Sequence, residues 1–191
     1  MNYKPYRHHR RSIRLKGYDY SQPGWYFITI VVQNRQILFG DVVNGEMVLN
    51  NAGRIADQCW REIPKHYPNV QLDEYVIMPN HVHGIIGIIM DDKNAGAKNF
   101  TNVGVQNFEP LRFESMHREN KYQKIIPRSI GSIIRGFKIG VTKWFRQNTE
   151  IYTVWQRNYW DHIIRNEIEL NRIRDYIINN PKNWNKDRYR F

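Results

Sequence analysis

Two histidines one residue apart are the first candidates for chemistry in this chain. They occur as His81-Val82-His83, inside an apolar segment and directly after a Pro79-Asn80 break. Side chains at positions i and i+2 of a strand point to the same face of a sheet, so both imidazoles can reach one cation. Imidazole binds Zn, Mn, Fe and similar ions. A bare His-x-His also arises by chance, and two structural histidines remain the alternative for the pair alone.

A catalytic metal needs further ligands, and the expected last helix brings two side chains into consideration. Tyr176 and Asn180 are four residues apart and so share one side of a helix. They fall at the border of the apolar face that contains Ile173 and Ile177, from which they could face a metal. Spacing alone leaves open that Tyr176 is a tyrosine at the edge of the core and that Asn180 only ends the helix.

The charge of the chain favours a polyanionic partner. The 191 residues include 29 Lys and Arg against 18 Asp and Glu, which gives a formal net charge of +11. Nucleic acid is the first candidate. A membrane is not expected, because no apolar run approaches the roughly 20 residues of a spanning helix and no segment has one basic and one apolar face. The lone Cys59 cannot form an intrachain disulfide, and we expect an intracellular protein.

Basic side chains gather in two places. Residues 1–22 form a basic, aromatic N-terminal arm, which either is disordered or lies along a phosphate backbone. The helix expected over residues 127–146 has basic side chains outside its apolar face, and a solvated basic surface is the alternative to DNA contact there. The candidate DNA-binding residues are Arg10, Arg11, Arg14, Arg128, Arg135 and Lys138.

Hydrophobic periodicity predicts an α+β fold. Its elements follow the β-α-β-β-α-β order of ferredoxin-like and RRM-like antiparallel sheets, with helices on one face, an added β-hairpin and a C-terminal helix. We expect a domain over residues 23–184, interrupted by an insertion loop at about 91–124, and a basic C-terminal tail over 185–191. The elements are strands at 25–32, 70–78, 82–89 and 153–164, a hairpin around Asn44-Gly45, and helices at 51–63, 127–146 and 166–179.

Several motifs in one order carry a family resemblance. The chain resembles the REP-associated tyrosine transposases, the single-tyrosine branch of the His-hydrophobe-His nucleases, from about Arg11 to Trp184. The insertion at 91–124 matches nothing in that family. The motifs are Gly17-Tyr18-Asp19-Tyr20, Met78-Pro79-Asn80-His81-Val82-His83-Gly84, Ile134-Arg135-Gly136-Phe137-Lys138, Val154-Trp155-Gln156-Arg157-Asn158-Tyr159, Asp161-His162-Ile163-Ile164-Arg165 and Arg174-Asp175-Tyr176-Ile177-Ile178-Asn179-Asn180-Pro181.

The resemblance implies a role for each site residue. His81 and His83 match the family's metal-binding histidines, Asn180 its third metal ligand and Tyr176 its nucleophile. The ion would be Mg²⁺ or Mn²⁺. The substrate would be single-stranded DNA that folds into a hairpin of the repetitive extragenic palindromic type, cleaved and rejoined through a 5′-phosphotyrosine. The enzyme would be a monomer or homodimer in a prokaryotic cytoplasm, associated with the nucleoid.

Two other functions remain possible from the sequence. Replication initiators and relaxases share the histidine pair but usually have further domains, which this short chain cannot hold. A non-catalytic nucleic-acid-binding module or repressor on an RRM-like sheet would need solvent-facing aromatic side chains on its central strands, and Trp25, Tyr26 and Phe27 would have to supply them.

Overall fold

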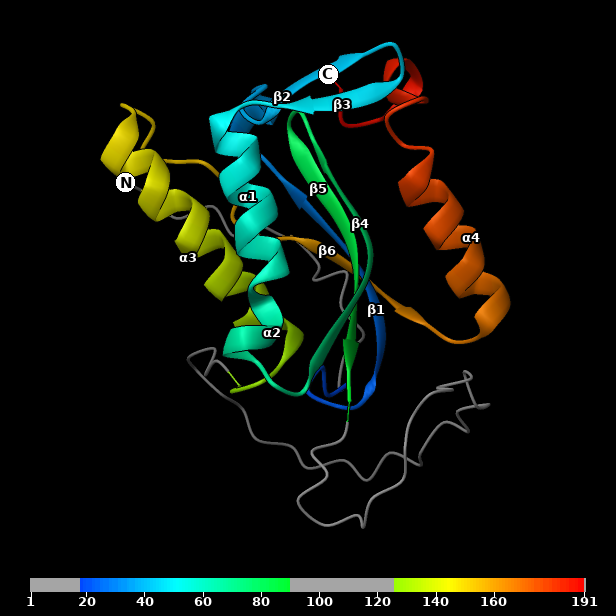
Figure 1. The fold of residues 1–191 in the computed structure, drawn as a ribbon. Helices are drawn as coiled ribbons and strands as arrows, with labels where there is room; N and C mark the ends of the chain where they lie inside the picture. Colours follow the sequence, from blue (N-terminus) through cyan, green and yellow to red (C-terminus); the bar gives the residue numbers. More distant parts are fainter. Residues whose placement is uncertain (1–17, 90–125, 191) are drawn as a thin grey trace, which may run out of the picture.

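A four-stranded antiparallel sheet with helices on both faces organises the chain (Figure 1). The computed structural model describes residues 18–89 and 126–190. The arm residues 1–17 and the whole of the expected insertion loop lie outside these ranges. The elements are β1 (Gly24–Val31), η2 (Gln33–Arg35), β2 (Gly40–Val43), β3 (Glu46–Leu49), α1 (Asn51–Arg61), α2 (Ile63–His66), β4 (Val70–Met78), β5 (His81–Ile88), α3 (Ile130–Asn148), β6 (Trp160–Ile164), α4 (Glu167–Ile178) and η3 (Trp184–Lys186).

The strand order β4-β5-β1-β6 confirms the ferredoxin-like prediction. The strands and crossover helices β1, α1, β4, β5, α3 and β6 follow the expected β-α-β-β-α-β sequence, and every pairing in the sheet is antiparallel. Helices α1 and α3 lie on one face, and α4 lies on the other (Figure 1). The hairpin β2–β3 is inserted between β1 and α1 as a separate two-stranded sheet.

Alternating side chains of β1 divide the core between the two faces. Tyr26, Ile28 and Ile30 are fully buried in the larger cluster, which also contains the apolar sides of α1 and α3. Phe27 points to the opposite face and packs in a smaller cluster with α4. Thr29 has the same parity as Phe27, so it shares that second face. The same face carries His81 and His83, which pair with Val31 and Thr29 of β1.

Local sequence signals set the ends of most elements. Asn44 and Gly45 have φ values of 53° and 80°, which is the geometry of a two-residue hairpin turn. Asn50, Ser129 and Asn166 each accept a backbone N–H three residues later, and so cap α1, α3 and α4.

Most boundaries lie within a few residues of the sequence prediction, and three differences are informative. Strand β5 begins at His81 rather than at residue 82, because His81 pairs with Val31 of the neighbouring strand β1. Helix α3 begins at Ile130, after its cap. Residues 153–155 contribute only an isolated bridge between Trp155 and Val32, so β6 itself is short. Among the described residues, no helix is both long and apolar enough to cross a membrane.

Candidate metal and nucleophile site

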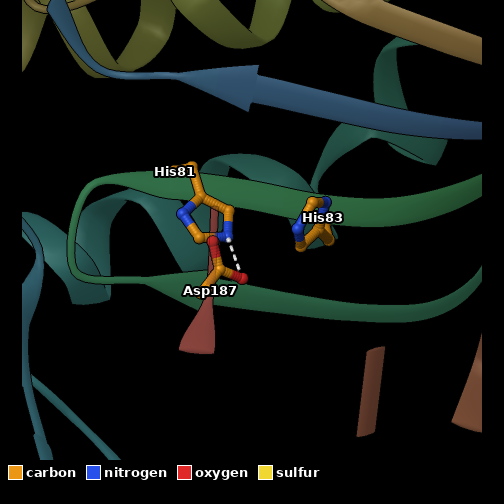
Figure 2. A group of neighbouring side chains, drawn as sticks. All are labelled: His81, His83 and Asp187. Carbon is orange, nitrogen blue, oxygen red and sulfur yellow. Dashed lines mark ion pairs between the residues drawn. The ribbon is translucent and has the colours of Figure 1, made fainter. Parts of the chain in front are cut away.

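The two histidines lie side by side at the start of β5, on the face that carries α4. Their ring centroids are 4.5 Å apart, and both side chains are completely buried. Figure 2 shows both rings projecting from the same strand, with Asp187 beside His81. The pairing of His83 with Thr29 of β1 and Val76 of β4 places it in the interior of the sheet. A rigid pair of imidazoles is therefore presented to one point in space.

Hydrogen bonds fix which nitrogen of His81 faces outward. Its Nδ1 lies 2.8 Å from Asn80 Oδ1, an atom that can only accept, so Nδ1 carries the proton. The orientation of the Asn80 amide is itself fixed, because its Nδ2 donates to the carbonyls of Arg35 and Tyr189. Nε2 of His81 therefore keeps its lone pair for a ligand. A partner on the far nitrogen is the usual arrangement for a metal-binding histidine.

His83 is arranged in the same way. Its Nδ1 lies 2.8 Å from the hydroxyl oxygen of Thr29 on the neighbouring strand. With Nδ1 donating to that oxygen, Nε2 is an acceptor, and the hydroxyl of Tyr176 lies 3.1 Å from it. In the tautomer that is protonated on Nδ1, His83 turns an unprotonated Nε2 toward α4, as His81 turns its own toward the C-terminal segment.

Two buried polar atoms at this point have no hydrogen-bond partner within the described part of the chain. They are His81 Nε2 and Asn180 Oδ1. Each buried polar atom that lacks a hydrogen bond lowers the stability of the fold by about 1–3 kcal/mol. Two such atoms in one site therefore indicate that a ligand binds there. Asp187 adds a carboxylate that is only 4% exposed, with Oδ2 4.0 Å from His81 Nε2 and accepting a 3.1 Å hydrogen bond from Asn180 Nδ2. One ligand atom from each of His81, His83 and Asp187 lies within 4.8 Å of the others, so these residues fit a divalent cation.

Burial keeps both imidazoles neutral. Desolvation lowers the pKa of His81 to about 4, with Arg188 lowering it further and Asp187 opposing the shift. Desolvation also lowers the pKa of His83 well below its usual value, and the neighbouring His81 and Arg188 act in the same direction. Neutral imidazole is the form that binds metal, so the site is prepared for a cation at neutral pH.

Tyr176 stands at the open edge of the site. It is 43% exposed, and its ring packs against His83 and, edge-on, against Phe27. Desolvation, with a contribution from Asp187, raises the pKa of its hydroxyl to about 12, while Arg188 lowers it. The hydroxyl is thus accessible to a substrate but protonated in the protein as described.

The position of Tyr176 follows from how α4 is attached. Leu170, Ile173 and Ile177 pack on the sheet with Phe27 and Ile85. These apolar contacts are supplemented by an ion pair two residues before the tyrosine. Arg174 donates from Nε and Nη2 to the two carboxylate oxygens of Asp73, at 2.7 and 2.5 Å. Asp73 lies in a bulge of β4 between Leu72 and Tyr75. A two-point contact of this kind sets both the position and the rotation of the helix.

The proposed DNA-binding side chains lie away from the histidines or outside the described ranges. Arg10, Arg11 and Arg14 fall outside them. Arg128 and Arg135 are exposed at the start and on the surface of α3, which covers the other face of the sheet. The Lys138 ammonium donates to the carbonyls of Gln156 and Asn158 at 2.9 and 2.8 Å, and burial lowers its pKa to about 8. Their contact with DNA stays a prediction.

The residues that sequence reasoning missed are in the last segment. The Tyr189 ring lies 4.9 Å from that of His81 and 5.7 Å from that of His83, and Asp187 and Arg188 precede it. We expected residues 185–191 to form a basic tail. The available signal was that Asp187 is the single acidic residue in that tail.

Comparison with known proteins gives the chain a family. No known family model matches it. An uncharacterized protein of Haemophilus influenzae is 49% identical over 180 residues, which is 94% of this chain and 92% of that protein. The two proteins belong to one family. A second Haemophilus influenzae protein, named provisionally as a REP-associated tyrosine transposase, is 22% identical over 167 residues, 85% of this chain and 73% of that protein.

A solved structure shares the fold. It is that of a REP-associated tyrosine transposase bound to a REP hairpin, with a TM-score of 0.51 and 18% identity over 91% of this chain and 72% of that chain. The resemblance drawn from the sequence motifs is therefore confirmed, since the chain is similar in sequence to one protein so named and shares its fold with another.

Proposed function

We propose that this protein is a metal-dependent DNA transposase that cleaves and rejoins single-stranded, hairpin-forming DNA through a covalent 5′-phosphotyrosine. The observation that carries the proposal is the grouping of a tyrosine hydroxyl, 3.1 Å from His83 Nε2, with two unpaired buried ligand atoms, His81 Nε2 and Asn180 Oδ1. A nucleophile and a set of metal ligands at one point are what strand transfer by a tyrosine needs.

A divalent cation, Mg²⁺ or Mn²⁺, would be held by His81 Nε2, His83 Nε2 and Asn180 Oδ1. Asp187 would supply negative charge beside them and hold the Asn180 amide through its Nδ2. When bound, the cation would act as a Lewis acid that neutralises charge developing on the scissile phosphate. Two observations support this assignment. Burial keeps both imidazoles neutral, and two of the proposed ligand atoms, His81 Nε2 and Asn180 Oδ1, have no hydrogen-bond partner among the described residues.

Tyr176 would be the nucleophile. Its oxygen forms a bond to phosphorus while the bond from phosphorus to the 3′-oxygen breaks. The tyrosine proton passes to water, and the departing 3′-oxygen takes up a proton to become a hydroxyl. The product is a 5′-phosphotyrosine. One phosphodiester linkage has replaced another, so the energy of the bond is retained. A second 3′-hydroxyl can then reverse the step and join strands without an external energy source.

The substrate proposal rests on charge and on the structural relative. The net charge of +11 suits a polyanion, and the solved transposase of the same fold is bound to a REP hairpin. We therefore infer hairpin DNA of the repetitive extragenic palindromic type, in a prokaryotic cytoplasm. The binding-module alternative is less well supported, because Tyr26 is fully buried and Phe27 only 7% exposed, so neither is free to stack on bases.

The proposal is tested by trapping the covalent intermediate. The purified protein is incubated with Mn²⁺ and a labelled single-stranded hairpin, and the mixture is separated on a denaturing gel. We expect a protein–DNA adduct that is absent in Tyr176→Phe and in reactions with excess EDTA.

A matched control is Tyr152→Phe, which removes the hydroxyl of another exposed tyrosine, one that bonds only to Glu150 among the described residues. It should leave the adduct unchanged. Hairpin binding without any adduct, across a panel of repetitive palindromes from bacterial genomes, would instead indicate a binding module.

A further inference from the structure

The C-terminal segment brings an arginine to the mouth of the site. Tyr189 packs over both histidine rings, and its carbonyl accepts a 2.7 Å hydrogen bond from Asn80 Nδ2. The carbonyl of Arg188 accepts a 3.1 Å bond from Arg35 Nη1. The backbone on both sides of the Arg188 side chain is thus fixed to the body of the domain.

The guanidinium of Arg188 is held but not neutralised. Its Cζ lies 4.7 Å from the Tyr189 ring centroid, and Nη2 donates to the Tyr189 hydroxyl. The residue is exposed, and none of the ion pairs within residues 18–89 and 126–190 includes it. The Tyr189 ring that it covers lies 4.9 Å from the His81 ring and 5.7 Å from the His83 ring, so the guanidinium is held one ring away from the histidine pair.

We propose that Arg188 is a catalytic residue that binds the non-bridging oxygens of the scissile phosphate as Tyr176 attacks it. This inference rests on the proposed function. In-line attack concentrates negative charge on those oxygens, and a guanidinium is suited to them because it offers several N–H donors in one plane. A cation that is fixed on the Tyr189 ring at the edge of the site would stabilise that charge without having to reorganise.

A purely structural role fits the contacts less well. The segment is attached through the carbonyls of Arg188 and Tyr189 and through the Asp187 carboxylate, which bonds the Tyr189 N–H and Asn180 Nδ2. Within the described part of the chain, truncating the Arg188 side chain removes only its two contacts with Tyr189, one to the hydroxyl and one to the ring. Lys186 provides a matched control, because it is an exposed cation two residues earlier in the same segment.

The test compares adduct formation by Arg188→Ala, Arg188→Lys and Lys186→Ala with that by the unmodified protein, with Mn²⁺ and saturating hairpin DNA. We expect Arg188→Ala to form the adduct roughly 100-fold more slowly. Arg188→Lys should recover part of the rate, and Lys186→Ala should be close to the unmodified protein.

The deciding substrate carries a methylphosphonate at the cleaved position, which replaces one charged oxygen by a methyl group. On it, the deficit of Arg188→Ala should shrink to roughly tenfold or less, because there is less charge to stabilise. An equal deficit on both substrates, or no deficit on either, would overturn the role of Arg188. Absence of adduct with the unmodified protein would contradict the proposed function itself.

Discussion

Acid should destabilise the metal-free protein through its buried histidines. Both side chains are fully buried, and the pKa of His81 falls to about 4 in the folded protein because burial disfavours the imidazolium. In the unfolded chain the same group has a pKa near 6.5. As the pH falls below that value, the His81 imidazole binds a proton in the unfolded chain but not in the folded protein. The stabilisation is therefore complete above about pH 7 and is lost as the pH falls toward 4.

The size of the effect follows from the shift. One pKa unit corresponds to about 1.4 kcal/mol, so the shift of His81 corresponds to about 3 kcal/mol of unfolding free energy. His83 is shifted in the same direction and adds to the loss. Against a total stability of about 5–15 kcal/mol for a domain, this is a large fraction.

The assay is urea unfolding in EDTA, followed by circular dichroism, at several pH values between about 7.5 and about 4.5. Carboxylates such as Asp73 also titrate toward the acid end, so the informative quantity is the difference from His81→Gln, which cannot titrate at this position. We expect the variant to lose about 2–3 kcal/mol less than the unmodified protein over this range. Parallel loss in the two proteins would refute the claim that His81 is held neutral by burial.

Three further perturbations probe the parts that position the site. Gly84→Ala should destabilise the fold by about 1–3 kcal/mol in urea unfolding, because a Cβ there would lie 2.3 Å from Trp60 Cζ2; an unchanged midpoint would contradict this. Asp73→Asn should slow adduct formation while hairpin affinity is retained, because Arg174 then holds the nucleophile helix less firmly; equal rates in a single-turnover assay would argue against that role. Asp187→Asn should weaken Mn²⁺ binding about 10- to 100-fold in calorimetry, and unchanged affinity would exclude Asp187 from the cation's surroundings.

The sequence was sufficient to place the four expected site residues near one another. The i, i+2 rule placed His81 and His83 on one face of β5. The i, i+4 rule was applied to Tyr176 and Asn180, although Asn180 follows the end of α4 at Ile178. Helix α4, which comes after the β-α-β-β-α-β order, packs on the face with the histidines and holds the Tyr176 hydroxyl 3.1 Å from His83 Nε2. Periodicity works here because each step is set by backbone geometry over a few residues.

The same reasoning failed where long-range contacts decide the structure. Asn80 bonds to the Tyr189 carbonyl across 109 positions, and Arg35 bonds to that of Arg188 across 153. No local period or turn signal indicates such contacts, so Asp187 was not assigned to the site.

His83 connects the state of the cation site to the state of the nucleophile. In the tautomer that is protonated on Nδ1, its Nε2 has a single lone pair, which accepts the hydroxyl proton of Tyr176. Once His83 gives that lone pair to a cation, the hydroxyl must find another acceptor, and the buried environment that raises its pKa to about 12 then contains an added positive charge. Opposite charge nearby favours the ionised form of a tyrosine. If the proposed cation binds at His83, the geometry would couple two events through one nitrogen. Occupation of the site would release the Tyr176 hydroxyl from His83 and lower its pKa, and the proposed nucleophile would then become reactive together with the cation.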